Sequence, residues 1–336
     1  MKISTKNEYG ELKSVIVGRP DHANWPTGDH YFDRLIQLST YKPGLKSGPV
    51  EATVIDEARE DAYAFVDLLK EHGVQVHRPE VIDWTRSVAS LNHVTQGMHS
   101  WSSRDLLLSV GDMIIECPTP FISRQHEHLA YQEIKNQAIA DGCRWIAAPV
   151  APMEPGECLI KEGKIKLTER YPIFDAANVL KFDDKLLYLV SSTGNYAGAN
   201  WLQNVVGSEF EVVVWDNVYN FAHIDSTLSV VNKNTVMLNA DRVSGDILPK
   251  FLKPFNKIWV HDCTPGPFYK FPYASKWIGM NTLAINPETM FVDSLQKDLT
   301  KQLNQANIKV LDLPLRHSRT LGGGFHCMTC DLERSS

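Results

Sequence analysis

Short runs of β-rich residues, joined by polar turns, recur along the chain. Two such runs around a turn of glycine, asparagine or aspartate are typical of a β-hairpin. Four segments have this pattern: residues 105–117, 178–191, 226–239 and 281–293. A fifth segment, residues 12–18, contains one clear strand pattern.

Helical periodicity and a further short strand follow each of these segments. The expected helices are residues 57–72, 127–141, 197–206, 244–252 and 294–306. The expected strands after them are residues 74–78, 144–148, 211–215, 257–261 and 308–313. Helices and strands could alternate by chance, but the repeated order favours five units of hairpin, helix and strand.

Two long proline-containing stretches, residues 20–54 and 149–172, interrupt this rhythm. Loops of such length are usually functional or act as lids. Low-complexity tracts and linkers that would divide the chain are absent from the sequence. We therefore expect a single domain, residues 1–336, of the α/β class.

Composition narrows the classes of function. The chain has 336 residues, 43% hydrophobic and 22% charged, and its net charge of −6 gives no general attraction to nucleic acid or anionic lipid. No apolar run approaches the roughly 20 residues of a membrane span, and the N-terminus shows no apolar signal region. We expect a cytoplasmic protein. Its six scattered cysteines do not suggest a disulfide framework.

Cys327 follows three consecutive glycines, which let the backbone approach a ligand closely. Three other interpretations of Cys327 and Cys330 remain open: a zinc site, a redox pair and buried structural cysteines. A zinc site needs a second pair of ligands, and a redox pair usually lies at a helix start near the N-terminus. The glycines match no phosphate-binding loop. We predict no metal and no cofactor.

A thiol nucleophile needs a base or a positive neighbour. His223 and Asp225 precede a predicted strand, where alternation would place both on one face. Asp175 and Asp105 also precede hairpins. Taken separately, these residues have simpler interpretations. His223 and Asp225 could be a core pair, Asp175 a turn residue, and Arg104 with Asp105 a surface ion pair.

In a pseudo-symmetric ring of five modules, equivalent strand ends converge near the axis. That arrangement would bring Asp105, Asp175 and Asp225 into one central cavity with His223 and Cys327. Carboxylates accept paired hydrogen bonds from a planar guanidinium group. Three carboxylates without a cation would repel one another, so a cationic ligand is expected.

Several motifs resemble those of the amidinotransferases in the guanidino-modifying (pentein) superfamily. The motifs are Asn7–Gly18, Arg104-Asp105, Phe174-Asp175-Ala176-Ala177, His223-Ile224-Asp225, Ser275-Lys276-Trp277 and Gly322-Gly323-Gly324-Phe325-His326-Cys327. They lie in family order along nearly the whole chain. The sequence looks most similar to the inosamine-phosphate branch, followed by the glycine amidinotransferases. The resemblance implies an α/β propeller of five ββαβ modules around a central cavity.

The resemblance also implies roles for individual residues. Cys327 matches the nucleophile, His223 the general acid–base and Asp175 the carboxylate that orients it. Asp105 and Asp225 match positions that hold the guanidinium group.

Two further positions match donor contacts: Arg242 a residue that binds the donor's carboxylate, and Ser275 an additional contact. We place Asn220 and Ala222 in the acceptor pocket. Ala222 replaces a bulky methionine of the glycine enzymes, which suggests a roomier pocket. Asn178 replaces the second aspartate of the family motif and receives no catalytic role.

Two more departures are Ala274, where a relative has serine, and a short tail after Cys330, which would lack any C-terminal pocket contact.

By this resemblance the protein transfers the amidino group of L-arginine to a primary amine by a ping-pong route. An amidino-cysteine forms and ornithine leaves, as expected for natural-product biosynthesis. The resemblance also allows a homodimer. An arginine deiminase-like hydrolase, an arginine:glycine amidinotransferase and a non-catalytic binding protein on the same fold are the alternatives.

Overall fold

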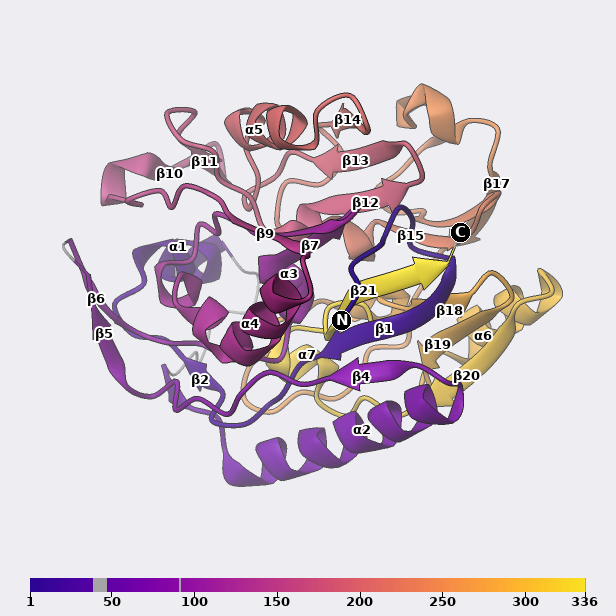
Figure 1. Ribbon diagram of the computed structural model, residues 1–336, viewed down its shortest axis with the longest axis horizontal. Helices are drawn as coiled ribbons and strands as arrows, with labels where there is room; N and C mark the ends of the chain where they lie inside the picture. Colours follow the sequence, from indigo (N-terminus) through magenta and orange to yellow (C-terminus); the bar gives the residue numbers. More distant parts are fainter. Residues whose placement is uncertain (39–46, 91, 336) are drawn as a thin grey trace.

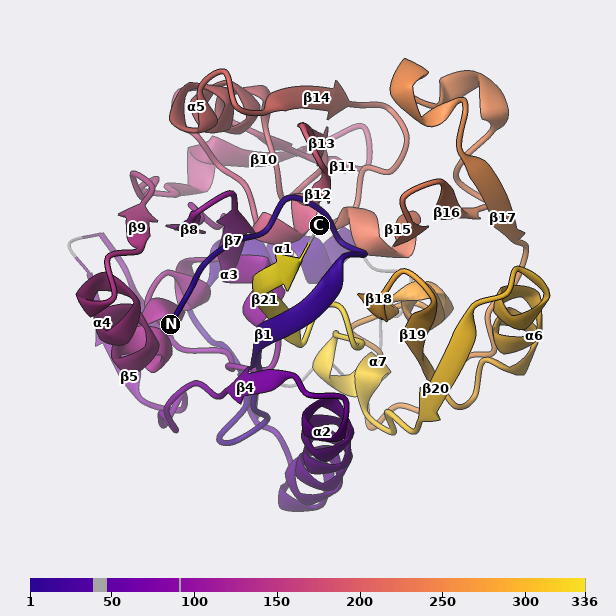
Figure 2. The same ribbon diagram turned by 45° about the vertical axis from the view of Figure 1, so that its right-hand side comes forward.

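A computed structural model describes residues 1–38, 47–90 and 92–335 of the chain. Its described part contains five three-stranded sheets, which follow one another around the molecule (Figure 1, Figure 2). In each sheet a central strand pairs antiparallel with one neighbour and parallel with the other. The predicted α/β class is therefore correct.

Four sheets are built from the four predicted hairpins and the strand that follows each helix. Their strands are β7 (Leu107–Val110), β8 (Met113–Glu116) and β9 (Arg144–Ala147); β12 (Val179–Phe182), β13 (Lys185–Leu189) and β14 (Glu211–Trp215); β15 (Leu228–Asn232), β16 (Thr235–Asn239) and β17 (Asn256–Val260); and β18 (Leu283–Asn286), β19 (Thr289–Asp293) and β20 (Lys309–Leu313). Within each hairpin the paired residues lie close in sequence, which explains why the local pattern predicted them.

The fifth sheet joins both ends of the chain. β1 (Glu11–Val17) lies between β21 (Thr329–Ser335), its antiparallel partner, and β4 (Gln75–His77), its parallel partner. β21 was not predicted from the sequence. Because β1 needs this partner, the segment just after Cys327 is fixed to the start of the chain.

Most of the expected helices are present. They are α2 (Ala52–Glu71), η2 (Glu127–Tyr131) with α4 (Gln132–Ala140), α5 (Tyr196–Val206) and α6 (Lys297–Gln305). The helix predicted over residues 244–252 is wrong, because two 3₁₀ turns occupy this segment, η6 (Gly245–Ile247) and η7 (Lys250–Leu252). Pro249 lies between them; it has no amide hydrogen to donate and restricts φ, so a continuous helix cannot form.

The two long stretches contain short elements of their own. Residues 20–54 include β2 (Asn24–Trp25), α1 (His30–Leu38) and β3 (Gly48–Pro49), while residues 39–46 lie outside the described residues. Residues 149–172 include η3 (Pro155–Glu157) and the antiparallel pair β10 (Cys158–Lys161) and β11 (Lys164–Leu167). A further pair, β5 (Ser87–Ala89) and β6 (Val94–Gln96), follows β4.

A network of charged side chains is buried where β21 meets the neighbouring modules. Arg104 contacts Asp331 at 2.9 Å and Glu8 at 3.3 Å, and Lys181 contacts Glu8 at 3.1 Å. Arg334 donates to Asp331 at 2.8 Å. The surface ion pair considered for Arg104 with Asp105 is therefore wrong, because Arg104 is buried and bonded to other carboxylates.

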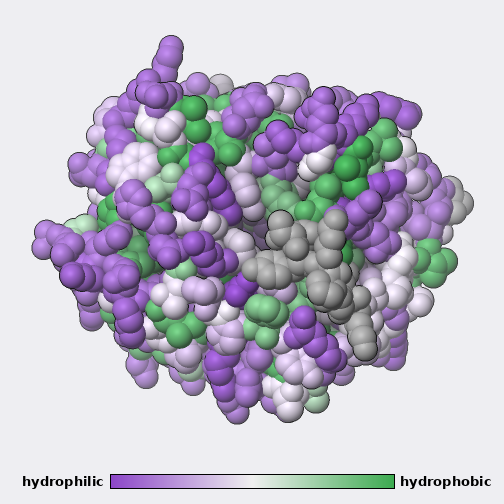
Figure 3. All heavy atoms as spheres, turned by 180° about the vertical axis from the view of Figure 1, so that it is seen from behind, coloured by the Kyte–Doolittle hydropathy of each residue, from purple (hydrophilic) through white to green (hydrophobic). Residues whose placement is uncertain are grey.

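On the outside, hydrophilic and hydrophobic side chains are interspersed (Figure 3). Within the described ranges, no helix combines the length and the apolar character that a membrane crossing requires.

Candidate active site

A short helical turn precedes the first strand of four of the sheets. These turns are α3 (Ser103–Leu106) before β7, η4 (Ala176–Asn178) before β12, η5 (Ile224–Ser226) before β15 and η8 (Lys276–Met280) before β18. They carry or directly follow Asp105, Asp175, His223, Asp225 and Ser275. The glycine segment that ends at Cys327 has the same position before β21. Equivalent ends of the five sheets thus bring together residues that are far apart in the sequence. For example, Trp101 Nε1 donates to the Gly323 carbonyl, 222 residues away.

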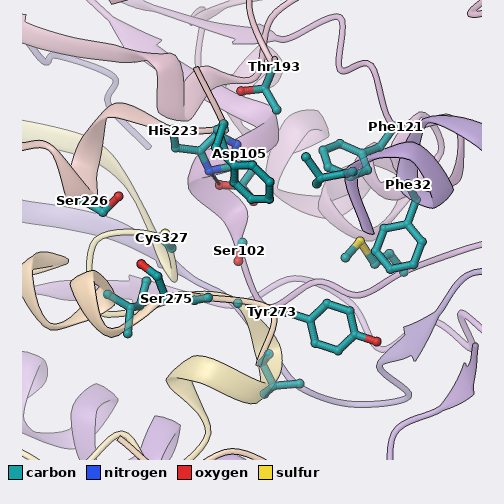
Figure 4. A pocket seen from close by; sticks show the side chains of 18 of the residues that line it. Phe32, Ser102, Asp105, Phe121, Thr193, His223, Ser226, Tyr273, Ser275 and Cys327 are labelled. Carbon is teal, nitrogen blue, oxygen red and sulfur yellow. Dashed lines mark ion pairs between the residues drawn. The ribbon is translucent and has the colours of Figure 1, made fainter. Parts of the chain in front are cut away.

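One cavity of about 380 Å³ receives most of these side chains. Asp105, His223, Asp225, Ser275 and Cys327 all line it. Figure 4 shows Cys327, Ser226, Ser275 and His223 around one side of this cavity, with Asp105 beside His223. Asp175 lies behind His223 and reaches the cavity through that imidazole.

Cys327 is held by Asn281 on two sides. The Cys327 backbone N–H donates to Asn281 Oδ1 at 2.9 Å, and Asn281 Nδ2 donates to Cys327 Sγ at 3.1 Å. A Cβ atom at Gly324 would lie 2.8 Å from the Asn281 Cβ atom, so a side chain there would separate the two segments. The glycines therefore permit this close approach.

The Cys327 thiol donates to Asp225 Oδ2 at 3.4 Å. Burial, followed by the negative charges of Asp225 and Asp105, raises the pKa of this thiol well above its usual range. With the cavity unoccupied by a cation, Cys327 is a protonated thiol at neutral pH.

His223 is placed between two carboxylates. Its Nε2 lies 2.8 Å from Asp175 Oδ2, and its Nδ1 lies 3.5 Å from Asp105 Oδ1. Burial acts to lower the pKa of His223, but Asp105 and Asp175 together raise it to about 9. The imidazole is therefore positively charged at neutral pH and has a proton to give.

The predicted alternation of His223 and Asp225 on a strand is wrong in its geometry. His223 caps the 3₁₀ turn η5, and β15 begins only at Leu228. The turn nevertheless directs His223 and Asp225 toward the cavity and buries Ile224 in the core.

One oxygen of Asp105 is hydrogen-bonded, and the other faces His223 Nδ1 at 3.5 Å without a hydrogen bond. Its Oδ2 accepts from Arg124 Nη1 at 2.6 Å, whereas its buried Oδ1 has no hydrogen-bond partner among the described residues. Arg124 also donates to Glu127 at 2.9 Å. An unpaired buried acceptor is unfavourable, so Asp105 Oδ1 is suited to a donor from a ligand.

Asp225 is the second carboxylate at the cavity. His326 Nδ1 lies 3.1 Å from its Oδ2, and His326 Nε2 lies 3.4 Å from Glu8 Oε2. Burial acts to raise the pKa of Asp225, but His326 and His223 lower it below its ordinary value. Asp225 is therefore an anion facing the thiol.

Sequence reasoning missed three residues of this site: Arg124, Asn281 and His326. Asn281 marks the start of a predicted hairpin, and His326 lies within the motif that ends at Cys327. Arg124 has no local signal, because its partner Asp105 belongs to a different element.

The two residues predicted to contact the donor, Ser275 and Arg242, differ in their position relative to the cavity. Ser275 lines the cavity, whereas Arg242 is not among its lining residues. Arg242 Nη1 donates to the Ser226 hydroxyl at 2.9 Å, and its guanidinium lies 3.6 Å from the centroid of the Tyr219 ring. Since Ser226 and Tyr219 both line the cavity, Arg242 lies directly behind its wall.

The two residues predicted for the acceptor pocket also differ in their position relative to the cavity. Ala222 lines the cavity, but Asn220 does not. The Asn220 carbonyl accepts from the Ser192 N–H at 3.2 Å, so its backbone fixes the loop that carries Ala222.

Of the alternatives for the cysteines, the structural one agrees with the burial of Cys330, and Cys327 is buried as well. All six cysteines are free, and Cys330 Sγ points to the Leu107 carbonyl at 3.4 Å. Among the described residues, no three His, Cys, Asp or Glu side chains are grouped as metal ligands.

Comparisons with known proteins agree with this geometry. No family model matches the chain. It is 37% identical to an inosamine-phosphate amidinotransferase of Streptomyces glaucescens, over 99% of this chain and 97% of that protein. It is 30% identical to a mitochondrial glycine amidinotransferase of Xenopus tropicalis, over 99% and 83%.

Two solved structures are similar over the whole chain. An inosamine-phosphate amidinotransferase of Streptomyces griseus has a TM-score of 0.95 at 37% identity, covering 99% of this chain and 97% of that one. An amidinotransferase of the saxitoxin biosynthetic pathway from Microseira wollei has a TM-score of 0.91 at 25% identity, covering 99% and 98%. A dimethylarginine dimethylaminohydrolase, at 13% identity and a TM-score of 0.61, covering 95% and 99%, shares the pentein fold.

Proposed function

Since the chain belongs to the amidinotransferases, which are transferases, we propose that it moves the amidino group of L-arginine to a primary amine and releases ornithine. The observation that carries this proposal is the convergence in one cavity of a thiol, a charged imidazole and two carboxylates, one with an oxygen that accepts no hydrogen bond. A guanidinium group supplies the planar, paired donors and the positive charge that such carboxylates accept.

In the first half-reaction the guanidinium lies between Asp105 and Asp225. Its charge offsets the two carboxylates, so the Cys327 thiol loses its proton to solvent and attacks the guanidinium carbon. A carbon–sulfur bond forms, and the bond from carbon to the δ-nitrogen breaks. His223 donates a proton to the departing nitrogen, ornithine leaves, and an amidino-thioether remains on Cys327.

In the second half-reaction the acceptor amine enters beside the neutral His223. The imidazole takes a proton from the amine as nitrogen bonds to the amidino carbon. The carbon–sulfur bond then breaks, and Cys327 leaves as a thiolate that regains its proton from solvent. Asp175 keeps His223 oriented through both steps, because its carboxylate fixes Nε2.

Arg242 and Ser275 are proposed to bind the carboxylate of the donor. Support comes from Ser275 in the cavity wall and from Arg242 behind Ser226 and Tyr219. The wall between Arg242 and the cavity would have to open by a side-chain rotation before direct contact.

The whole chain, residues 1–336, is proposed to act as one pseudo-symmetric propeller domain around this cavity. Both chain ends support this proposal, since β1 and β21 form one sheet beside the cavity. A homodimer is proposed by family resemblance alone.

The first half-reaction tests the proposal without knowledge of the acceptor. The protein is mixed with labelled arginine, ornithine is counted per subunit, and the Cys327 peptide is examined for an added amidino group. We expect one ornithine and one modified Cys327 per subunit. Cys327→Ala abolishes both products, while the matched variant Cys143→Ala, half-buried and outside the cavity, retains them. Stoichiometric citrulline would establish a hydrolase instead, and unconsumed arginine would exclude arginine as the donor.

A further inference from the structure

The cavity has a second, apolar end away from the reactive groups. Trp25, Phe32, Leu35, Phe121 and Tyr273 line it, and we call these residues the apolar end. Figure 4 shows Phe32, Phe121 and Tyr273 together on the side away from Cys327, His223 and Ser226. The rings of Trp25, Phe32 and Tyr273 stack on one another.

Helix α1 supplies this end of the cavity. Asp29 Oδ1 accepts from the Tyr31 and Phe32 N–H groups, both at 3.0 Å, and so fixes the start of the helix. Asp29 Oδ2 accepts from Ser123 of the neighbouring 3₁₀ turn η1 (Ile122–Arg124) at 2.9 Å. The buried Asp29 carboxylate therefore ties the start of α1, which carries Phe32, to η1, which directly follows Phe121.

The five described residues of the apolar end include no lysine, arginine or histidine. Among the lining residues that the structure describes, Arg124 is the single lysine or arginine. Its Nη1, Nε and Nη2 donate to Asp105, Glu127 and the Ser102 carbonyl. His99 also lines the cavity, but burial and then Arg124 lower its pKa to about 3, so it is neutral.

We propose that the amine acceptor carries its primary amine on an uncharged, apolar body that binds against the apolar end, and that it has no phosphate group. This proposal rests on the proposed function, because the amine head must reach His223 and the amidino-thioether of Cys327. It separates this chain from the amidinotransferases that are named for an inosamine phosphate. A phosphate buried against the apolar end would find no lysine or arginine among the described residues there, which is costly.

The dimensions fit such an acceptor. The cavity of about 380 Å³ lies within the range of roughly 300–1,000 Å³ that small-molecule sites occupy. Aromatic walls with a few convergent polar groups are typical of sites that bind an apolar body and orient one polar head. Ala222 beside His223 leaves room for the carbon that bears the amine.

A series of acceptors tests this proposal with the intact protein and arginine as donor. Primary alkylamines from propylamine to octylamine, with phenethylamine, are compared with glycine and glucosamine 6-phosphate by the rate of guanidine-product formation. We expect kcat/KM to rise roughly fourfold for each added methylene until the apolar end is filled. Equal kcat/KM values along the alkylamine series, or a preference for glycine or for the phosphorylated amine, would overturn the proposal.

Two substitutions on α1 form a matched pair. Leu35 is half-buried and lines the cavity, whereas Gln37 is exposed and does not. Leu35→Lys lowers the ratio of kcat/KM for hexylamine to that for propylamine by roughly tenfold, since three methylenes lose an apolar contact. Gln37→Lys leaves this ratio unchanged. An equal change in both variants, or none in Leu35→Lys, would contradict the assignment.

Failure of this inference is distinguishable from failure of the proposed function. Ornithine release and modification of Cys327 by arginine alone report the first half-reaction and require no acceptor. If they occur while long-chain amines gain nothing, the acceptor class is wrong and the function stands. If they do not occur, the proposed function fails first.

Discussion

Asp225 is expected to suppress the reactivity of Cys327 in the absence of a cation. Its Oδ2 lies 3.4 Å from Cys327 Sγ. At an effective dielectric constant of about 20, two unit charges at that distance repel by about 5 kcal/mol. This repulsion opposes loss of the thiol proton and so raises the pKa of Cys327. Asp225→Asn removes the charge and keeps the size of the side chain.

Asp225→Asn therefore changes reactivity toward two electrophiles in opposite directions. Iodoacetamide is neutral and needs only the thiolate, so its reaction with Cys327 at neutral pH accelerates at least tenfold. Arginine needs Asp225 as a partner for its guanidinium, so ornithine release slows by roughly a hundredfold or more, the loss of a buried charged hydrogen bond.

The assay is peptide mass spectrometry of Cys327 after timed exposure to iodoacetamide across a pH series. Asp183→Asn is the control, since Asp183 bonds Asn7 and Tyr9 away from the thiol. Alkylation of Cys327 that is no faster in Asp225→Asn than in the native chain would refute the electrostatic reasoning. Retained ornithine release would separately refute the role of Asp225 in donor binding.

Two further predictions concern charge inside the protein. Since carboxylates raise the pKa of His223 to about 9, its imidazolium stabilises the fold fully below about pH 6.5, and that contribution is lost as pH rises through about 9. Asp175→Asn lowers this pKa and moves the alkaline limb of ornithine release to lower pH by roughly one unit; an unmoved limb would contradict His223 as the acid. Lys181→Met removes one buried partner of Glu8 and leaves it with Arg104 and His326. We expect it to lower the free energy of unfolding in urea by about 3 kcal/mol, whereas Lys185→Met, at a partly exposed pair, costs less than about 1 kcal/mol. Equal losses of unfolding free energy in the two variants would show that the buried ion pair stabilises the fold no more than the exposed one.

Local sequence patterns predicted four of the five sheets because each hairpin pairs residues that are near neighbours. The sequence did not predict β21, and the reason is physical. Its residues Asp331 and Arg334 are charged yet buried, since each finds a partner in the charged network with Arg104. A search for alternating apolar residues cannot recognise a strand whose inward positions are charged.

The residues that we propose as reactive lie in sequence motifs, whereas the residues that position them do not. Cys327, His223 and Asp175 lie in contiguous sequence signatures. Asn281 and Arg124 act on residues 46 and 19 positions away, and only the folded chain brings these pairs together. The role of a neighbour that positions a reactive group is a tertiary property, so composition and spacing could not reveal it.

The carboxylates that we propose as guanidinium partners also affect the free thiol. Asp105 and Asp225 raise the pKa of Cys327 when the cavity holds no cation. On the proposed function, a bound guanidinium offsets part of this negative charge and so favours a thiolate beside the carbon that it attacks. We infer that binding of the donor and formation of the nucleophile are coupled through the charges of Asp105 and Asp225.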